Sequence, residues 1–357
     1  MGNRPRVLCY DMGGKRIRAA VATRDGLLET VAEDLPDACD NPALNAIGER
    51  LGDQVLGQSG TRREDLLGIG FGAAGEWEGL IIRWSPNNPV RDNIAVCKHV
   101  SEYYGRQRQT LGANDLKAAV HAVPLYGHGR NRQEKDRLIV CAITYSDGNN
   151  IAILNRNQPY PGYSDLSQEV GHAHIEHGDR ARWCGCGARG CFEAYVSGTA
   201  AAHMAIEALL ARRNKLGDEP IFQIARKALE EKKGPLSPEA VLLGVRAEHV
   251  YAALAQGDPI AQGIRQTQRY YIAQQLTHVC LHHRPQLIEL FGGLTNQREL
   301  FQDAIDDLRQ FPARYSTPSF VPAEVIKITD LGDTIGLHGA AAMVFLAHEA
   351  KRLPPRL

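Results

Sequence analysis

Near the start of the chain, apolar and polar residues alternate in a pattern that predicts two paired β-strands. The segment "RVLCYDMGGKRIRAAVATRDG" contains an apolar strand, a turn at Gly13 and Gly14, and a second strand in which apolar residues alternate with Arg16 and Arg18. Dinucleotide-binding folds and P-loops have a helix after the glycine turn instead of a second strand. The pattern therefore favours neither of those two modes of phosphate binding.

A second segment repeats this pattern further along the chain. "DRLIVCAITYSDGNNIAILNRNQPY" contains an apolar strand, a polar turn at residues 146–150 and another apolar strand, about 135 residues after the first hairpin. Two equivalent hairpins at this separation are typical of an internal duplication with a cleft between the halves. Hairpins are also common enough to occur twice by chance, and the pattern alone leaves both interpretations open.

The remaining segments predict a mixed α/β order. "LLGIGFGAAGEW" predicts a strand, and "IIRWSPNNP" after it predicts a turn-rich loop. After residue 190, apolar residues recur at three- and four-residue intervals, which predicts a series of core helices. A short buried strand then meets Gly292 and Gly293. That turn either lets a phosphate or a flat ring approach backbone amides or serves only to pack a strand against a helix.

Composition narrows the classes of function. The 357 residues include 41 basic and 41 acidic side chains, and 43% are hydrophobic, so the chain can form a large core divided into two lobes. Because the numbers of basic and acidic side chains are equal, the sequence gives no sign of the basic surface that nucleic-acid binding requires. The sequence contains neither a targeting pattern nor an apolar run of membrane-spanning length. We expect a cytoplasmic protein whose partners are small molecules, not nucleic acids or membranes.

Three of the eight cysteines gather in "WCGCGARGCFEAY". The C-x-C-x4-C spacing offers three ligands for a tetrahedral zinc ion, and His172, His174 and His177 lie just upstream as candidates for the fourth. A closed Cys3His site has no open position and would be structural. Three free thiols are the alternative. A disulfide framework is not expected, because the other cysteines are scattered singly through apolar segments.

Taken in order, these segments resemble the ROK family of sugar kinases and related repressors, within the actin-like, hexokinase-like ATPase superfamily. The resemblance rests on "DMGGKRIRAAV", "PNNP", "ANDLKAAV", "SDGNN", "EVGHAH", "CGCGARGCFEAYVSG", "LFGG" and "GLHGAAA". It implies a two-lobed, duplicated α/β fold of actin-like (ribonuclease H-like) type, with an interlobe cleft and a structural zinc loop. Residues 1–113 plus about 340–357 would form the smaller lobe, and residues 114–339 the larger.

The resemblance also assigns roles residue by residue. The zinc ligands would be His172, Cys184, Cys186 and Cys191, with His174 as a substitute for His172 because the interval to Cys184 is longer than expected. Asp115 would be the general base. The sugar would be held by Asn87, Asn114, Asp115, Glu169, His172 and Glu193. ATP with Mg²⁺ would be bound by Asp11, Gly13, Gly14, Lys15, Ser146, Asp147, Gly148, Gly292 and Gly293.

The residues alone allow simpler interpretations of three of these positions. Asn114 and Asp115 stand where a strand gives way to a helical run, and both residue types are favoured as helix caps. Asp11 precedes the glycine pair and is also typical of a turn.

The two phosphate loops depart from the family pattern, and so does the segment after Asp115. Lys15 in the first loop stands where threonine is usual, and Lys117, after Asp115, stands where a small or amide residue is common. The segment Tyr145–Asn149 stands where Gly-Thr-Gly-x-Gly is typical, which sets Asp147 near the expected phosphates. A carboxylate there repels ATP unless a cation compensates.

We therefore predict a glucokinase-like enzyme that transfers phosphate from ATP to a hexose or N-acetylhexosamine, with a homodimer implied by the family. The departures keep open an unusual phosphate donor or a catalytically silent sugar sensor. A metal-dependent hydrolase is disfavoured, since a closed Cys3His site has no open coordination position. A repressor is also disfavoured, because the first phosphate loop is reached by residue 11 and leaves no room for a winged helix before it.

Overall fold

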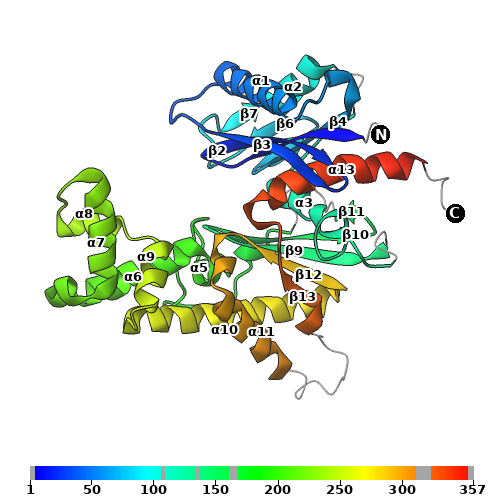
Figure 1. The fold of residues 1–357 in the computed structure, drawn as a ribbon. Helices are drawn as coiled ribbons and strands as arrows, with labels where there is room; N and C mark the ends of the chain where they lie inside the picture. Colours follow the sequence, from blue (N-terminus) through cyan, green and yellow to red (C-terminus); the bar gives the residue numbers. More distant parts are fainter. Residues whose placement is uncertain (1–4, 106–108, 134–136, 161–167, 311–322, 353–357) are drawn as a thin grey trace.

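The computed structural model describes residues 5–105, 109–133, 137–160, 168–310 and 323–352, and these form two lobes, each built on a β-sheet (Figure 1). The strand orders are β3-β2-β1-β4-β8 in the first sheet and β11-β10-β9-β12-β13 in the second. In both orders the first two pairings are antiparallel and the last two are parallel. The matching topology supports the predicted duplication over a chance similarity of two hairpins.

The first sheet begins with the predicted amino-terminal hairpin. Its strands are β1 (Arg6–Met12), β2 (Arg16–Thr23), β3 (Gly26–Asp34), β4 (Leu66–Ala73) and β8 (Gln109–Ala113). Helices α1 (Asn41–Gln58) and α2 (Val96–Tyr104) share one hydrophobic core with this sheet. Within that core the ring of Tyr10 stacks on Phe71 with their centroids 5.1 Å apart.

A small sheet beside this lobe corrects one expectation. Its strands are β5 (Glu76–Glu78), β6 (Ile81–Trp84) and β7 (Asp92–Ile94). The segment "IIRWSPNNP" was expected to be a loop throughout, but its first four residues form β6. These residues are β-branched or large and Ile82 is fully buried, so strand pairing with β5 prevails over the turn residues that follow.

The second sheet contains the second predicted hairpin. Its strands are β9 (Ile139–Tyr145), β10 (Asn149–Asn155), β11 (Gln158–Pro159), β12 (Leu287–Phe291) and β13 (Ile326–Ile328). Two long helices, α10 (Pro259–His283) and α11 (Arg298–Gln310), pack on one another and on this sheet. Arg269 donates two hydrogen bonds to Asp307 across the helix pair, at 2.7 and 2.6 Å.

The predicted core helices extend from the second sheet as a group with its own hydrophobic core. They are α5 (Glu193–Val196), α6 (Gly198–Ala211), α7 (Pro220–Lys233), α8 (Pro238–Leu243) and α9 (Ala247–Leu254), and α6 to α9 share that core with the start of α10. In Figure 1 α7 and α8 lie farthest from the sheets. None of the described helices is both long and apolar enough to cross a membrane.

The carboxyl-terminal helix α13 (Ile335–Arg352) returns to the first sheet and packs against β1 and β4 (Figure 1). It also contacts the short helices α3 (Asp115–Ala119) and α4 (Ala122–Leu125). Small residues make this approach close: a Cβ added at Gly70 would collide with the backbone carbonyl of Ala340. The helix starts before the predicted lobe boundary near residue 340, and the division at residues 113 and 114 stays a prediction.

Substitution of Gly70 by alanine should destabilise the protein because the new methyl group has no space beside α13. Overpacking of this kind lowers the free energy of unfolding by about 1–3 kcal/mol. Gly57→Ala is the matched control, since Gly57 is exposed at the end of α1 with open space around it. Alanine there should leave stability unchanged or raise it by up to about 1 kcal/mol. Urea unfolding followed by circular dichroism compares the two, and equal midpoints would contradict the packing argument.

Candidate active site

A cavity of about 350 Å³ lies where the two lobes meet. It is lined by the first hairpin, α3, the second hairpin, the glycine pair after β12 and the start of α13. The predicted site residues in its lining are Asp11, Gly13, Asp115, Ser146, Gly292 and Gly293. The structure therefore brings together residues that are up to 282 positions apart in the sequence, as the duplicated fold predicts.

Asp11 lies near the end of β1, where its side chain is buried in the wall of the interlobe cavity. Arg18 on β2 donates to its carboxylate at 2.5 Å and also to the backbone carbonyl of Asp333 at 2.7 Å. Gly336, near the start of α13, packs directly on this carboxylate. Burial raises the pKa of Asp11, and the charge of Arg18 opposes that rise.

Arg18 is a cleft residue that the sequence analysis did not assign. It lines the same cavity as Asp11 and Asp115. The signal was present, because an antiparallel hairpin that turns at Gly13 and Gly14 sets Asp11 opposite Arg18, and the observed register has this pairing.

Asn114 and Asp115 lie at the junction of β8 and α3. The side chain of Asn114 caps α3 by accepting hydrogen bonds from the backbone amides of Leu116 at 3.1 Å and Lys117 at 3.4 Å. The cap interpretation is thus confirmed for Asn114. Asp115 accepts from the amide of Leu116 at 2.9 Å and lines the cleft cavity.

The surroundings of Asp115 raise its pKa above the value of a free aspartate. Burial, followed by the negative charges of Asp11 and Glu169, raises the pKa of Asp115 from 3.8 to about 6. A carboxylate with a pKa near 6 is unprotonated at neutral pH yet basic enough to take a proton from a reacting hydroxyl.

The turn of the second hairpin is joined to Glu193, the first residue of α5. The backbone amide of Asn149 donates to a carboxylate oxygen of Glu193 at 3.0 Å, and Gly148 packs against the same carboxylate. The Asn149 side chain is itself buried, where its amide exchanges hydrogen bonds with Gln275 of α10 at 2.5 and 3.2 Å. Asn149 and Gln275 were missed, because nothing in the sequence pairs two amides 126 residues apart.

Glu169 precedes a short helical turn, η3 (Val170–His172), and His172 is the last residue of that turn. Asn150 donates to the Glu169 carboxylate at 2.6 Å. Burial raises the pKa of Glu169, while His172 and this hydrogen bond lower it. Gly171 packs on the backbone carbonyl of Asn149, so Asn149 contacts both predicted sugar-binding segments.

The ligand atoms of His172, Cys184, Cys186 and Cys191 all lie within 4.8 Å of one another. His172 Nδ1 is 3.6 Å from Cys184 Sγ, and Cys186 Sγ is 3.7 Å from Cys191 Sγ. A tetrahedral zinc with bonds of about 2.0–2.3 Å separates its ligand atoms by about 3.5–3.8 Å, so this donor set fits zinc. None of the eight cysteines, all of which lie in the described part of the chain, is joined in a disulfide. His174, the alternative ligand, is exposed and lies outside the cluster.

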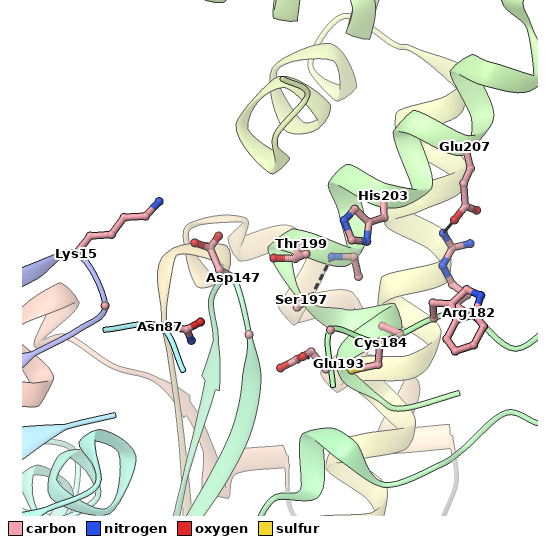
Figure 2. Close-up of a pocket in the computed structure, with 16 residues that line it drawn as sticks. Lys15, Asn87, Asp147, Arg182, Cys184, Glu193, Ser197, Thr199, His203 and Glu207 are labelled. Carbon is pink, nitrogen blue, oxygen red and sulfur yellow. Dashed lines mark hydrogen bonds and ion pairs between the residues drawn. The ribbon is translucent and has the colours of Figure 1, made fainter. Parts of the chain in front are cut away.

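A second, larger cavity of about 670 Å³ opens beside Glu193 (Figure 2). The predicted residues in its lining are Gly14, Lys15 and Asn87 from the first lobe and Asp147, Gly148, Cys184 and Glu193 from the second. Cys184 Sγ lies 3.4 Å from a carboxylate oxygen of Glu193, so a residue of the Cys3His cluster contacts this carboxylate directly. A third cavity of about 610 Å³ is lined by α9, Gly293, Ser146 and Asp147.

Replacement of Asp11 should shift the titration of Asp115. The carboxyl group of Asp115 is expected to titrate at about pH 6, and Asp11→Asn should lower that pKa because one of the charges that raise it is removed. Asp92→Asn, on the exposed strand β7, is the control and should change nothing. Carbon-13 NMR of the aspartate carboxyl groups measures the midpoints. An unchanged Asp115 midpoint in Asp11→Asn would show that the two groups do not interact.

Comparison with known proteins places this architecture in one family. The sequence profile of the ROK family matches residues 7–346. The glucokinase of Thermotoga maritima is 24% identical over 340 residues, which cover 95% of this chain and 97% of that protein.

Two solved structures are similar over almost the whole chain. A ROK hexokinase from Thermus thermophilus has a TM-score of 0.71 and 21% identity, with 97% of this chain and 99% of the hexokinase covered. A ROK family glucokinase from Streptomyces griseus, in complex with glucose and AMPPNP, has a TM-score of 0.68 and 23% identity, with 94% and 98% covered. The predicted fold class is confirmed, and the chain belongs to the ROK family.

Proposed function

We propose that the protein is an ATP-dependent sugar kinase that transfers a phosphoryl group to a hydroxyl of a hexose or N-acetylhexosamine. The observation that carries the proposal is the position of Asp115. Its carboxylate lines the interlobe cavity together with Asp11 and the glycine turns, and its pKa of about 6 suits a general base. The curated relative from Thermotoga maritima, which matches over nearly its full length, is named a glucokinase.

In this proposal Asp115 accepts the proton of the sugar hydroxyl as that oxygen attacks the terminal phosphorus of ATP. The bond between this phosphorus and the oxygen that bridges it to ADP breaks, and ADP leaves with the bridging oxygen. Backbone at Gly13, Ser146, Gly292 and Gly293 surrounds the triphosphate, since these residues line the cavity from both lobes. The Asp11 carboxylate at the cavity wall would hold Mg²⁺ through water molecules, and the ion supplies positive charge to the phosphates. Asn87, Asn114, Glu169, His172 and Glu193 hold the sugar.

The unusual phosphate loops carry compensating charges. Lys15 of the first loop and Asp147 of the second line one cavity from opposite lobes (Figure 2). In the adjoining cleft Arg18 is paired with the Asp11 carboxylate. Lys15 would thus offset the charge of Asp147, and Arg18 offsets that of Asp11, which favours a kinase over the alternative of a silent sugar sensor. The assignments of Lys15, Asp147 and Gly148 to nucleotide binding, a homodimer and a cytoplasmic location belong to the same proposal.

A coupled assay should detect phosphorylation of at least one sugar when hexoses and N-acetylhexosamines are supplied with ATP and Mg²⁺. Asp115→Asn should lower kcat by about 10²–10⁴-fold, because the general base is lost. Sugar affinity, measured by calorimetry, should change far less. In the native enzyme kcat/KM should rise with pH and level off above about pH 6, since the base must be unprotonated. Asp92→Asn again serves as control. Sugar binding without turnover of any member would favour the sensor.

We also propose that the Cys3His cluster holds a structural zinc ion that orients Glu193. Elemental analysis should find about one zinc per chain, because four ligands close the coordination shell. Cys186→Ser should lose the metal, lower the melting temperature and raise the KM for the sugar more than it lowers kcat. Cys39→Ser, outside the cluster, should retain zinc and activity. A Cys186→Ser protein that is free of zinc but has native stability and KM would contradict the structural role.

A further inference from the structure

The large cavity continues beyond Glu193, away from the interlobe cleft. Its outer part lies between α6 and the metal-binding hairpin, residues 183–189. Thr199, His203 and Glu207 line it from successive turns of α6 (Figure 2). They lie four residues apart, so this wall is about 12 Å long at 1.5 Å per residue. The row is longer than one six-membered sugar ring and starts close to the proposed sugar-binding carboxylate.

Trp183 lines the same outer part and is unusually exposed for its size, with 62% of its surface accessible. The Arg189 guanidinium lies over the indole, 4.2 Å from the ring centroid. Trp183 and Arg189 form an antiparallel β-bridge, and the backbone amide of Cys184 donates a hydrogen bond to the backbone carbonyl of Ala188 at 2.9 Å. The indole is therefore held on an ordered hairpin, and the described residues leave most of its surface accessible. Exposed indoles at cavity walls commonly bind ligands through their apolar face.

The outer part of the cavity has no excess of positive charge among its described residues. Arg182 is paired with Glu207 at 2.8 Å, and Arg189 lies over the indole of Trp183, so these two cations are matched by Glu207 and Glu193. Lys15 and Asp147, assigned above to the nucleotide, line the opposite end of the cavity (Figure 2). The outer part therefore does not favour an anionic ligand such as a phosphate chain. Hydroxyl-rich neutral ligands, in contrast, can bond to the Thr199 hydroxyl, the His203 ring and the carboxylates while one ring face stacks on an indole.

We propose that the outer part of this cavity, defined by Trp183, Thr199, His203 and Glu207, binds a second neutral sugar ring linked to the acceptor sugar. The proposal rests on the proposed function, because it places the acceptor sugar against Glu193. Asp115 lines the interlobe cavity, whereas Glu193 lines the larger cavity of about 670 Å³. The second ring is thus attached to the acceptor at the end away from the hydroxyl that is phosphorylated. The substrate class then includes disaccharides in addition to monosaccharides.

Calorimetric titration without nucleotide tests this subsite separately from catalysis. The probes are glucose and N-acetylglucosamine, with cellobiose, maltose and N,N′-diacetylchitobiose as their disaccharides. We expect at least one disaccharide to bind 10-fold or more tightly than its own monosaccharide. If no disaccharide exceeds its monosaccharide, the subsite proposal fails even when monosaccharides are phosphorylated. Absence of phosphorylation with disaccharide-selective binding would instead overturn the kinase proposal and leave the subsite in place.

Two variants assign the preference to this cavity. Trp183→Ala should reduce the disaccharide preference to within about 2-fold of the monosaccharide, and its zinc content checks that the adjacent metal site is intact. Trp84→Ala is the matched control, because Trp84 is also exposed but lies on β6, outside the lining. His203→Ala, on the exposed face of α6, should weaken disaccharide binding without affecting the hairpin. Wild-type preference in both Trp183→Ala and His203→Ala would overturn the proposal.

Discussion

Close packing of α13 against the first lobe is the constraint on which the cleft depends. Three small residues on one side of this helix approach other backbone or side-chain groups: Gly336 meets Asp11, Gly339 meets the carbonyl of Ala118, and Ala340 meets Gly70. A larger side chain at any of the glycines would push the helix away. The same helix therefore sets the distance between the end of β1 and α3, and with it the relation between Asp11 and Asp115.

Glu193 has a comparable position in the second lobe. Its carboxylate is held by the turn of the second hairpin through Asn149 and touched by Cys184 of the metal cluster. Asn149 in turn depends on a buried amide partner, Gln275, whose loss would leave unpaired polar atoms in the core. A sugar held by Glu193 would thus be positioned by the same hairpin that is proposed to contact ATP, which couples recognition of the two substrates mechanically.

The proposed phosphate end of the cleft contains charged side chains at positions where the family pattern has uncharged residues. Lys15 and Asp147 introduce opposite charges where uncharged residues are usual, and Arg18 pairs with Asp11 across the first hairpin. A cation beside the proposed magnesium-binding carboxylate lowers the pKa of that group, which burial would otherwise raise further. In the proposed nucleotide site these charges are of opposite sign in pairs, Lys15 with Asp147 and Arg18 with Asp11, so each carboxylate has a cation to offset it.

Local patterns in the sequence were sufficient for the two hairpins, most helices, the cysteine cluster and the family, because each depends on residues close together in the chain. They failed at residues 81–84, where burial of Ile82 and pairing with β5 outweighed nearby turn residues. Only the tertiary structure placed His172 rather than His174 in the Cys3His cluster, joined Asn149 to Gln275, and brought Trp183 and α6 to the same cavity. These relations depend on how distant segments pack, and a linear pattern contains no information on which of many polar pairs will meet. The sequence by itself determined the local elements and the chemical groups available, whereas packing between the lobes decided which groups share a site.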